Sequence, residues 1–240
     1  MRAGALIALA VLCSLAGCQE SGFDEARETQ RPLKVQHAMN MLEGTKVPGV
    51  AERPMTLDPS ALGDTLALGV EPVRAALPGG RVPDYLREEA AGVEIVAPLT
   101  DLDLAATDAA EPDLILGSKE DQEELYEDLS RIAPTVMTEG DNWKLNLRLH
   151  GEALGRTNDA ERLLIDWDNR AAAVRRRLGA HEAVSLPGHV TPFAAQVLTD
   201  LGLKAATGDA GDLHVDGGPE WTDGGVLAAR AALEDVAAEL

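Results

Sequence analysis

The stretch NDAERLLIDWDNRAAAVRRRLG, residues 158–179, decides the fold more than any other part of the sequence. Its apolar side chains stand three or four positions apart, the spacing of one face of a helix, at Leu163, Leu164, Trp167, Ala171, Val174 and Leu178. Asn158 and Glu161 fit a capping box at its start, and Gly179 fits its end. A helix of this length measures roughly 30 Å, about the width of a domain. The pattern therefore predicts either a crossover helix or a rigid strut between two lobes, with its apolar face packed.

Short apolar runs alternate with helical patterns on both sides of this stretch. Strands are predicted at residues 55–57, 92–96, 112–117, 135–137, 183–186 and 213–215, and helices after the long one at 191–201 and 225–239. Strands that alternate with helices indicate a parallel α/β fold. We therefore expect an α/β protein with a first lobe at residues 45–157, a connecting helix at 158–179 and a second lobe at 180–240.

The composition excludes several classes of function. The chain has 41 Asp and Glu against 21 Lys and Arg, which argues strongly against a nucleic-acid partner because phosphates require clustered cations. No Gly-x-Ser-x-Gly, His-Glu-x-x-His or phosphate-loop motif occurs, so no enzymatic activity is expected. No cofactor or metal site is predicted either, because metal-ligand spacing is missing among the histidines, His37, His150, His181, His189 and His214.

The first 18 residues have the layout of an export signal. Arg2 precedes an apolar run, residues 3–15, which is too short to span a bilayer. The run ends in LAGC, residues 15–18, which resembles the lipobox of bacterial lipoproteins. This resemblance implies a signal peptide at 1–17, lipid such as palmitate on Cys18, and a tether at 18–44 on the extracytoplasmic face of the cell membrane. The alternatives are a plain secretory signal with an incidental cysteine and a buried N-terminal helix.

Five further motifs resemble a known family in their order along the chain. They are TLDPSAL at 56–62 with LALGV at 66–70, EPDLILGSK at 111–119, LSRIAPT at 129–135, WKLNLR at 143–148 with EALGR at 152–156, and WTDGG at 221–225 with LAA at 227–229. Together they resemble the substrate-binding lipoproteins of bacterial ABC importers for iron-siderophore complexes. The resemblance implies two Rossmann-like lobes joined by one long helix. It also implies a monomer that captures a ferric siderophore and delivers it to an ABC permease.

The sequence departs from that family in two places. The second lobe, 180–240, is unusually short, and TPF at 191–193 lacks the arginine or tyrosine that many relatives place there to meet the ligand. Ala105 stands where relatives usually carry a glutamate that docks on the permease, with Asp101 and Asp103 nearby. These departures motivate a second hypothesis, a degenerate surface lipoprotein that keeps the first lobe and the long helix but transports nothing.

Six residues are predicted to contact the ligand because they stand at loops or helix starts on the expected mouth of the cleft. They are Ser60, Arg81, Lys119, Trp143, Lys144 and Trp221. Tryptophans carry weight here because aromatic residues make up only 3% of the chain. Trp221 follows a Gly-Gly-Pro turn, whose small residues are not expected to bury a large ring.

Most of these residues have a structural alternative. Ser60 fits a helix N-cap as well as a ligand contact. Arg81 and Lys119 fit solvated surface cations, and Trp143 fits the core of an interface between lobes.

The class of siderophore follows only from charge. A chelated iron presents the outside of its chelator, which is recognised by aromatic faces and by cations or hydrogen-bond donors. A hydroxamate complex, near neutral or positive, fits an acidic protein better than a trianionic catecholate complex. Haem and cobalamin, which related proteins of the same architecture carry, stay open as ligands.

Overall fold

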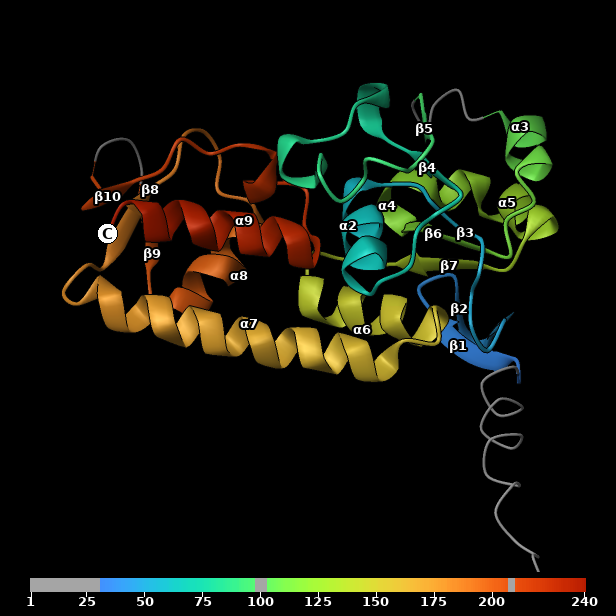
Figure 1. The fold of residues 1–240 in the computed structure, drawn as a ribbon, viewed down its shortest axis with the longest axis horizontal. Helices are drawn as coiled ribbons and strands as arrows, with labels where there is room; N and C mark the ends of the chain where they lie inside the picture. The colour runs from blue at the N-terminus through green and yellow to red at the C-terminus, as the bar shows by residue number, and fades with distance from the viewer. Residues whose placement is uncertain (1–30, 98–102, 207–209) are drawn as a thin grey trace, which may run out of the picture.

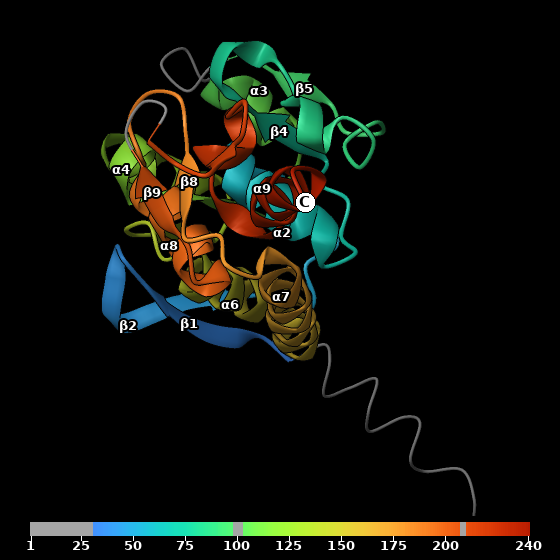
Figure 2. The ribbon, with the colours of Figure 1, turned by 90° about the vertical axis from the view of Figure 1, so that its left-hand side faces the viewer.

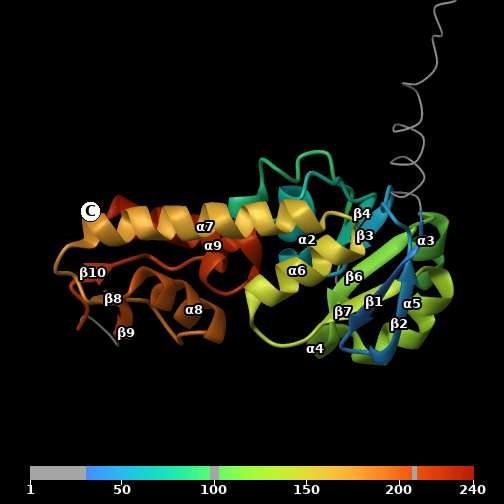
Figure 3. The ribbon, with the colours of Figure 1, turned by 90° about the horizontal axis from the view of Figure 1, so that it is seen from below.

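The computed structural model of the chain describes residues 31–97, 103–206 and 210–240. Two parallel β-sheets lie toward the two ends of the molecule (Figure 1). The long helix α7 (Thr157–Leu178) begins at the edge of the first sheet's lobe and runs to the far end beside the second sheet (Figures 1 and 3). The α/β class predicted from the sequence is confirmed. The predicted signal peptide at 1–17, Cys18 and residues 19–30 lie outside the described residues.

The first lobe is built on a five-stranded sheet with the order β5-β4-β3-β6-β7. Its strands are β3 (Pro54–Thr56), β4 (Arg74–Ala76), β5 (Ile95–Val96), β6 (Leu114–Ser118) and β7 (Thr135–Thr138), and every neighbouring pair is parallel. The chain leaves β3 toward β4 and β5, then returns to the other side of β3 as β6. This reversal of strand order creates a crevice beyond the carboxyl ends of β3 and β6, the place where open α/β sheets bind ligands.

Helices surround this sheet and connect its strands. They are α2 (Pro59–Ala67), α3 (Leu104–Ala109), α4 (Lys119–Gln122), α5 (Tyr126–Ile132) and α6 (Trp143–Ala153), with short 3₁₀ turns η1 (Pro78–Gly80), η2 (Asp84–Leu86) and η4 (Glu123–Leu125). The first four residues of β6 are buried, which explains its uninterrupted apolar sequence. α4 starts directly after β6, and two residues separate α2 from the end of β3, so the first turns of both helices lie at the crevice.

The predicted tether at residues 18–44 is too long. β1 (Leu33–His37) and β2 (Asn40–Val47) form an antiparallel hairpin on the β7 side of the first lobe, away from β4 and β5 (Figure 2). Val35 and Val47 point inward and are at most 1% exposed. His37 accepts a hydrogen bond on Nδ1 from the Met137 backbone N–H, at 3.2 Å. In β1 the buried Val35 and His37 alternate with the exposed Lys34 and Gln36, which is a strand pattern, whereas burial in β2 does not alternate.

The long helix matches its predicted range to within one residue, but its predicted start is wrong. The N-cap is Arg156, whose side chain makes no cap hydrogen bond, and Asn158 already lies inside the helix. Glu161 does not reach back to the helix start; its carboxylate accepts from Arg148 of α6 at 2.7 Å. The predicted apolar face is buried at Leu164, Trp167, Ala171, Val174 and Leu178, and Gly179 ends the helix with φ of 61°.

The second lobe has a three-stranded parallel sheet with the order β10-β8-β9. Its elements are β8 (Ala183–Ser185), α8 (Pro192–Leu201), β9 (Lys204–Ala206), β10 (Leu213–His214), η5 (Pro219–Trp221) and α9 (Gly225–Ala238). β9 lies in a region where the sequence predicts no strand. Its side chains are exposed or only half-buried, as expected for a strand at a sheet edge.

The two lobes share one continuous apolar core. α9 of the second lobe packs against α2 and α6 of the first lobe as well as against α7. At the centre, the Trp143 and Trp167 rings meet edge to face with centroids 5.1 Å apart. Within the ranges described above, none of the helices is both long enough and apolar enough to cross a membrane.

Candidate functional site

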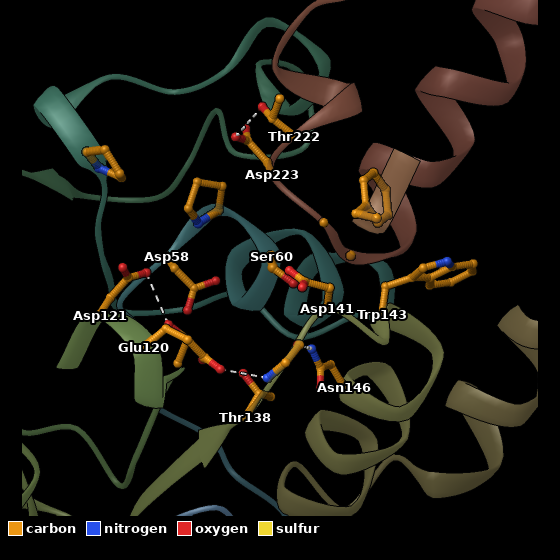
Figure 4. Close-up of a pocket in the computed structure, with 17 residues that line it drawn as sticks. Asp58, Ser60, Glu120, Asp121, Thr138, Asp141, Trp143, Asn146, Thr222 and Asp223 are labelled. Atoms are coloured by element: carbon orange, nitrogen blue, oxygen red, sulfur yellow. Dashed lines mark hydrogen bonds between the residues drawn. The ribbon is translucent and has the colours of Figure 1, made fainter. Parts of the chain in front are cut away.

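A cavity of about 340 Å³ lies between the lobes, at the crevice beyond β3 and β6 (Figure 4). Its walls come from four places: the strand ends of the first lobe, the loop and first turn of α6, the first turn of α8, and the loop and first residue of α9. The lining residues are Asp58, Pro59, Ser60, Pro78, Ser118, Glu120, Asp121, Thr138, Gly140, Asp141, Trp143, Asn146, Phe193, Thr222, Asp223, Gly224 and Gly225. The cavity therefore sits where the reversal of strand order predicts a ligand.

Asp58 forms the wall at the end of β3. It is the N-cap of α2, and its Oδ1 accepts a hydrogen bond from the Ala61 backbone N–H at 2.8 Å. The structural alternative for Ser60, a helix N-cap, is therefore wrong, since Ser60 lies in the first turn and lines the cavity. Burial raises the pKa of Asp58 to about 6, against the opposing effect of the Ala61 hydrogen bond.

The end of β6 supplies two further carboxylates, Glu120 and Asp121. Asp121 accepts from the Ser118 hydroxyl at 3.1 Å, and Glu120 accepts from the Gly140 backbone N–H at 2.7 Å. Both donors are uncharged, so they fix the positions of the carboxylates without neutralising them.

The second lobe closes the cavity with the loop Thr222–Gly225. Asp223 accepts a hydrogen bond from the Tyr85 hydroxyl of the first lobe at 3.1 Å. Burial raises the pKa of Asp223, and burial together with the Asp223 charge also raises the pKa of Tyr85, which keeps the phenol protonated and donating. Gly225 has φ of 84°, and a Cβ there would lie 3.0 Å from the Ser60 carbonyl oxygen. This close approach requires glycine.

Of the six residues predicted to contact ligand, the structure brings two, Ser60 and Trp143, to the cavity wall. Trp143 is only 1% exposed, so most of its ring serves as core between the lobes. Arg81 is exposed and outside the lining. Lys119 is outside it as well, because its Nζ donates to Glu139 at 2.6 Å, which also raises the pKa of the lysine.

Lys144 faces the lobe junction instead of the cavity. Its Nζ lies 2.8 Å from Asp200 of α8 and above the rings of Trp143 and Trp167, at 5.6 and 6.0 Å from their centroids. The Trp167 indole N–H donates to the same Asp200 carboxylate at 2.8 Å. These contacts join α6, α7 and α8, so Lys144 lies in the junction between the two lobes.

Trp221 is also placed differently from the prediction. It is 3% exposed, lies outside the cavity lining, and donates its indole N–H to Asp235 of α9 at 2.9 Å. Helix α9, which follows in the sequence, packs against η5 and helps to bury the ring, which the sequence around Trp221 did not indicate.

Sequence reasoning missed the carboxylates that form the cavity wall. In a sequence with many acidic residues, nothing in the local pattern singles out Asp58, Asp121 or Asp223. A usable signal was present, because Asp58 and Asp121 follow closely the two strands between which the strand order reverses. In the part of the chain that the structure describes, no group of three His, Cys, Asp or Glu residues is arranged to hold a metal ion.

The structure also shows the surroundings of Ala105, the position of the predicted permease contact. Ala105 is exposed in the first turn of α3. Asp103 is the N-cap of that helix and accepts from the Ala105 and Ala106 backbone N–H groups at 2.9 and 3.0 Å. Asp101 lies outside the described residues.

Comparison with known proteins agrees with this architecture. The chain is 33% identical over 214 residues to the probable siderophore-binding lipoprotein YfiY of Bacillus subtilis, covering 83% of this chain and 65% of the relative. It is 33% identical over 130 residues to the achromobactin-binding periplasmic protein of Dickeya dadantii, covering 53% and 43% of the two chains. The crystal structure of Staphylococcus aureus SirA complexed with staphyloferrin B superposes with a TM-score of 0.62 at 29% identity, covering 72% of this chain and 64% of that one.

The chain spans less than two thirds of the length of each of these relatives. The first two are named as binding proteins, and the third was crystallised in complex with staphyloferrin B, in keeping with the prediction that the chain is not an enzyme. Residues 56–187, more than half of the chain, match the family described as periplasmic binding protein. The chain therefore belongs to the periplasmic binding protein family.

Proposed function

We propose that this protein captures a ferric siderophore outside the cytoplasm and delivers it to an ABC permease. The observation that carries the proposal is the cavity between the lobes, which lies at the strand-order reversal and takes residues from both lobes. Relatives named as siderophore-binding proteins support the class of ligand. Iron enters here as cargo already held by its chelator, so the protein needs only to recognise the outside of the complex.

The proposal includes a lipid anchor at Cys18. The LAGC sequence at 15–18 supports lipidation, and one relative is itself named a lipoprotein. A lipidated chain would stay beside its permease on the extracytoplasmic face of the cell membrane. Metabolic labelling with a palmitate analogue tests this, and a Cys18→Ala variant that is labelled as strongly as the wild type contradicts it.

Within the siderophores, the charge of the cavity favours a hydroxamate complex over a trianionic catecholate complex. The wall carries several carboxylates, and an anionic ligand would be repelled by them. Haem carries propionate groups and is disfavoured for the same reason, whereas the side chains of cobalamin are amides and the charge of the wall does not exclude it.

Tryptophan fluorescence tests capture, because Trp143 lies on the cavity wall and ferric chelates quench an adjacent indole. Titration with ferric hydroxamates is expected to quench part of the emission in a saturable way. Failure of every ferric chelate to quench at micromolar concentration would refute the proposed function.

One alternative is supported by a specific observation. The second sheet has only three short strands, and the cavity of about 340 Å³ is at the lower end of the range for ligand pockets, roughly 300–1,000 Å³. A degenerate lipoprotein that binds no cargo would show the same features. The chain would then fail to restore siderophore uptake in a strain that lacks its own binding protein, and restored uptake would exclude this alternative.

A further inference from the structure

The cavity wall carries charge of one sign. Five of its residues are acidic, namely Asp58, Glu120, Asp121, Asp141 and Asp223, and the described lining contains no Lys, Arg or His. The two lysines nearest the cavity in sequence are paired elsewhere: Lys119 with Glu139 at 2.6 Å, and Lys144 with Asp200 at 2.8 Å. The cavity is therefore a region of strong negative potential.

Asp58 is the most confined of these carboxylates. It is 8% exposed, and its Oδ1 is used by the Ala61 backbone N–H. Its Oδ2 has no hydrogen-bond partner among residues 31–97, 103–206 and 210–240, and the residue borders the cavity. An ionised carboxylate that is buried without a cation is unfavourable, so this oxygen is available to a positively charged donor that enters the cavity.

Two other carboxylates are set around the same space from different elements. Asp121 lies on the same wall as Asp58, close enough that its charge helps to raise the pKa of Asp58, and Asp223 lies across from them on the second lobe (Figure 4). Asp121 accepts from the Ser118 hydroxyl, and Asp223 accepts from the Tyr85 and Thr222 hydroxyls; these uncharged donors hold the carboxylates in place. The arrangement is fixed before any ligand arrives.

We propose that the cavity recognises a ligand that carries a protonated amine, and specifically a ferric hydroxamate complex with an ammonium arm that lies among Asp58, Asp121 and Asp223. An ammonium group has three N–H donors and no acceptor, which suits a cavity wall that offers carboxylate oxygens and no lysine, arginine or histidine. This inference rests on the proposed function and narrows its substrate class.

Three ferric complexes separate charge from shape. The first is a linear ferric tris-hydroxamate that ends in a primary amine, the second is the same complex with that amine acetylated, and the third is a ferric tris-catecholate. Fluorescence quenching of the purified protein at pH 7.5 gives each affinity. The amine complex is expected to bind at least ten-fold more tightly than its acetylated counterpart, and the catecholate more weakly still.

The outcomes distinguish this inference from the proposed function. If no complex binds, the proposed function is refuted and the inference with it. If the acetylated complex or the catecholate binds as tightly as the amine complex, only the inference is refuted. A free alkyl diamine is the fourth probe, and diamine binding as tight as that of the complex would show that the site serves an amine without a chelate and would overturn the inference.

Substitutions locate the effect in the cavity. Asp58→Asn keeps a capping oxygen for Ala61, since asparagine is as good an N-cap as aspartate, but removes the charge. Asp121→Asn likewise removes a negative charge and keeps an acceptor oxygen for the Ser118 hydroxyl, at an exposed position where folding is not at risk. Each is expected to reduce the preference for the amine complex at least three-fold. Glu127→Gln, with a side chain that is 87% exposed on α5, changes the net charge equally and should leave the preference unchanged. Equal effects from all three variants would overturn the inference.

Discussion

Asp64 is a buried carboxylate that joins both lobes, and its removal is expected to destabilise the protein strongly. It is 0% exposed on α2. Its Oδ1 accepts from the Val226 backbone N–H of α9 at 2.8 Å, and its Oδ2 accepts from His150 Nδ1 of α6 at 2.8 Å. Gly224, the N-cap of α9, has no side chain to satisfy the first N–H groups of that helix. Asp64 therefore caps α9 from a position far away in the sequence, and its negative charge suits the helix N-terminus.

The size of the effect follows from what the substitution leaves behind. Asp64→Ala leaves two buried donors, the Val226 N–H and the His150 ring N–H, without their acceptor. Each orphaned buried group costs about 1–3 kcal/mol, so we expect a loss of about 2–6 kcal/mol. Asp64→Asn keeps one acceptor for Val226, so we expect a loss of about 1–3 kcal/mol. The matched control is Asp168→Ala, whose side chain is 72% exposed and lies 3.5 Å from Lys144. An exposed pair of this kind contributes about 0–1 kcal/mol.

Urea denaturation followed by far-UV circular dichroism measures these values, with the slope of the transition as a check that the denatured state is unchanged. In a thermal scan the alanine variant is expected to lose on the order of 10 °C in Tm. A double-mutant cycle with His150→Ala should give an interaction energy of at least about 1 kcal/mol, since the two side chains contact each other. A loss below about 1 kcal/mol for Asp64→Ala would refute the assignment of Asp64 as the link between the lobes.

Three further predictions concern residues outside the cavity. Burial lowers the pKa of His37 from 6.5 to about 4, so the unfolded chain takes up a proton between these pH values that the folded chain refuses. The free energy of unfolding of the wild type therefore falls as the pH drops from 6.5 toward 4. The His37→Gln variant lacks this proton uptake, so the difference in urea midpoint between wild type and variant should shrink over the same pH range. A difference that stays constant would contradict the lowered pKa of His37. Trp221→Phe loses the bond to Asp235 and should lower stability by about 1–3 kcal/mol in urea while leaving chelate affinity within two-fold; a larger affinity loss would restore Trp221 as a ligand contact. Lys144→Met should cost at most about 1 kcal/mol in the same assay, because its pair with Asp200 is partly exposed, and a loss above about 2 kcal/mol would contradict that reasoning.

The parts of the fold that the sequence predicts well are those in which one local pattern decides the structure. The run at 112–117 is apolar because β6 is buried in the middle of a sheet, and the spacing at 158–179 is helical because one face of α7 packs. β9 is different. This strand has only three residues, which are exposed or half-buried, and its geometry depends on pairing with β8, which no local pattern encodes.

The site was predicted less well because its contacts are made between distant segments. Whether Trp221 meets ligand or core depends on α9, and whether Lys144 faces the cavity depends on Asp200 of α8. In the same way, Asp58 becomes a special carboxylate only when the structure buries it opposite Asp223. Residue type and position after a strand indicate which loops form the cavity, but the direction of each side chain is set by tertiary packing.

The direct contacts between the two lobes indicate that the cavity binds its ligand without the lobes opening and closing around it. The lobes are joined directly beside the cavity by three hydrogen bonds, from Tyr85 to Asp223 at 3.1 Å, from the Gln196 amide to the Asp141 carbonyl at 2.6 Å, and from the Val226 N–H to Asp64 at 2.8 Å. Opening the lobes would break these bonds and expose core that α9 shares with α2. A ligand is therefore expected to enter a cavity whose walls are already formed, so its affinity depends on how well its charge and shape match those walls. In such a site the sign of the charge excludes ligands more strictly than it would in a cleft that closes around its cargo.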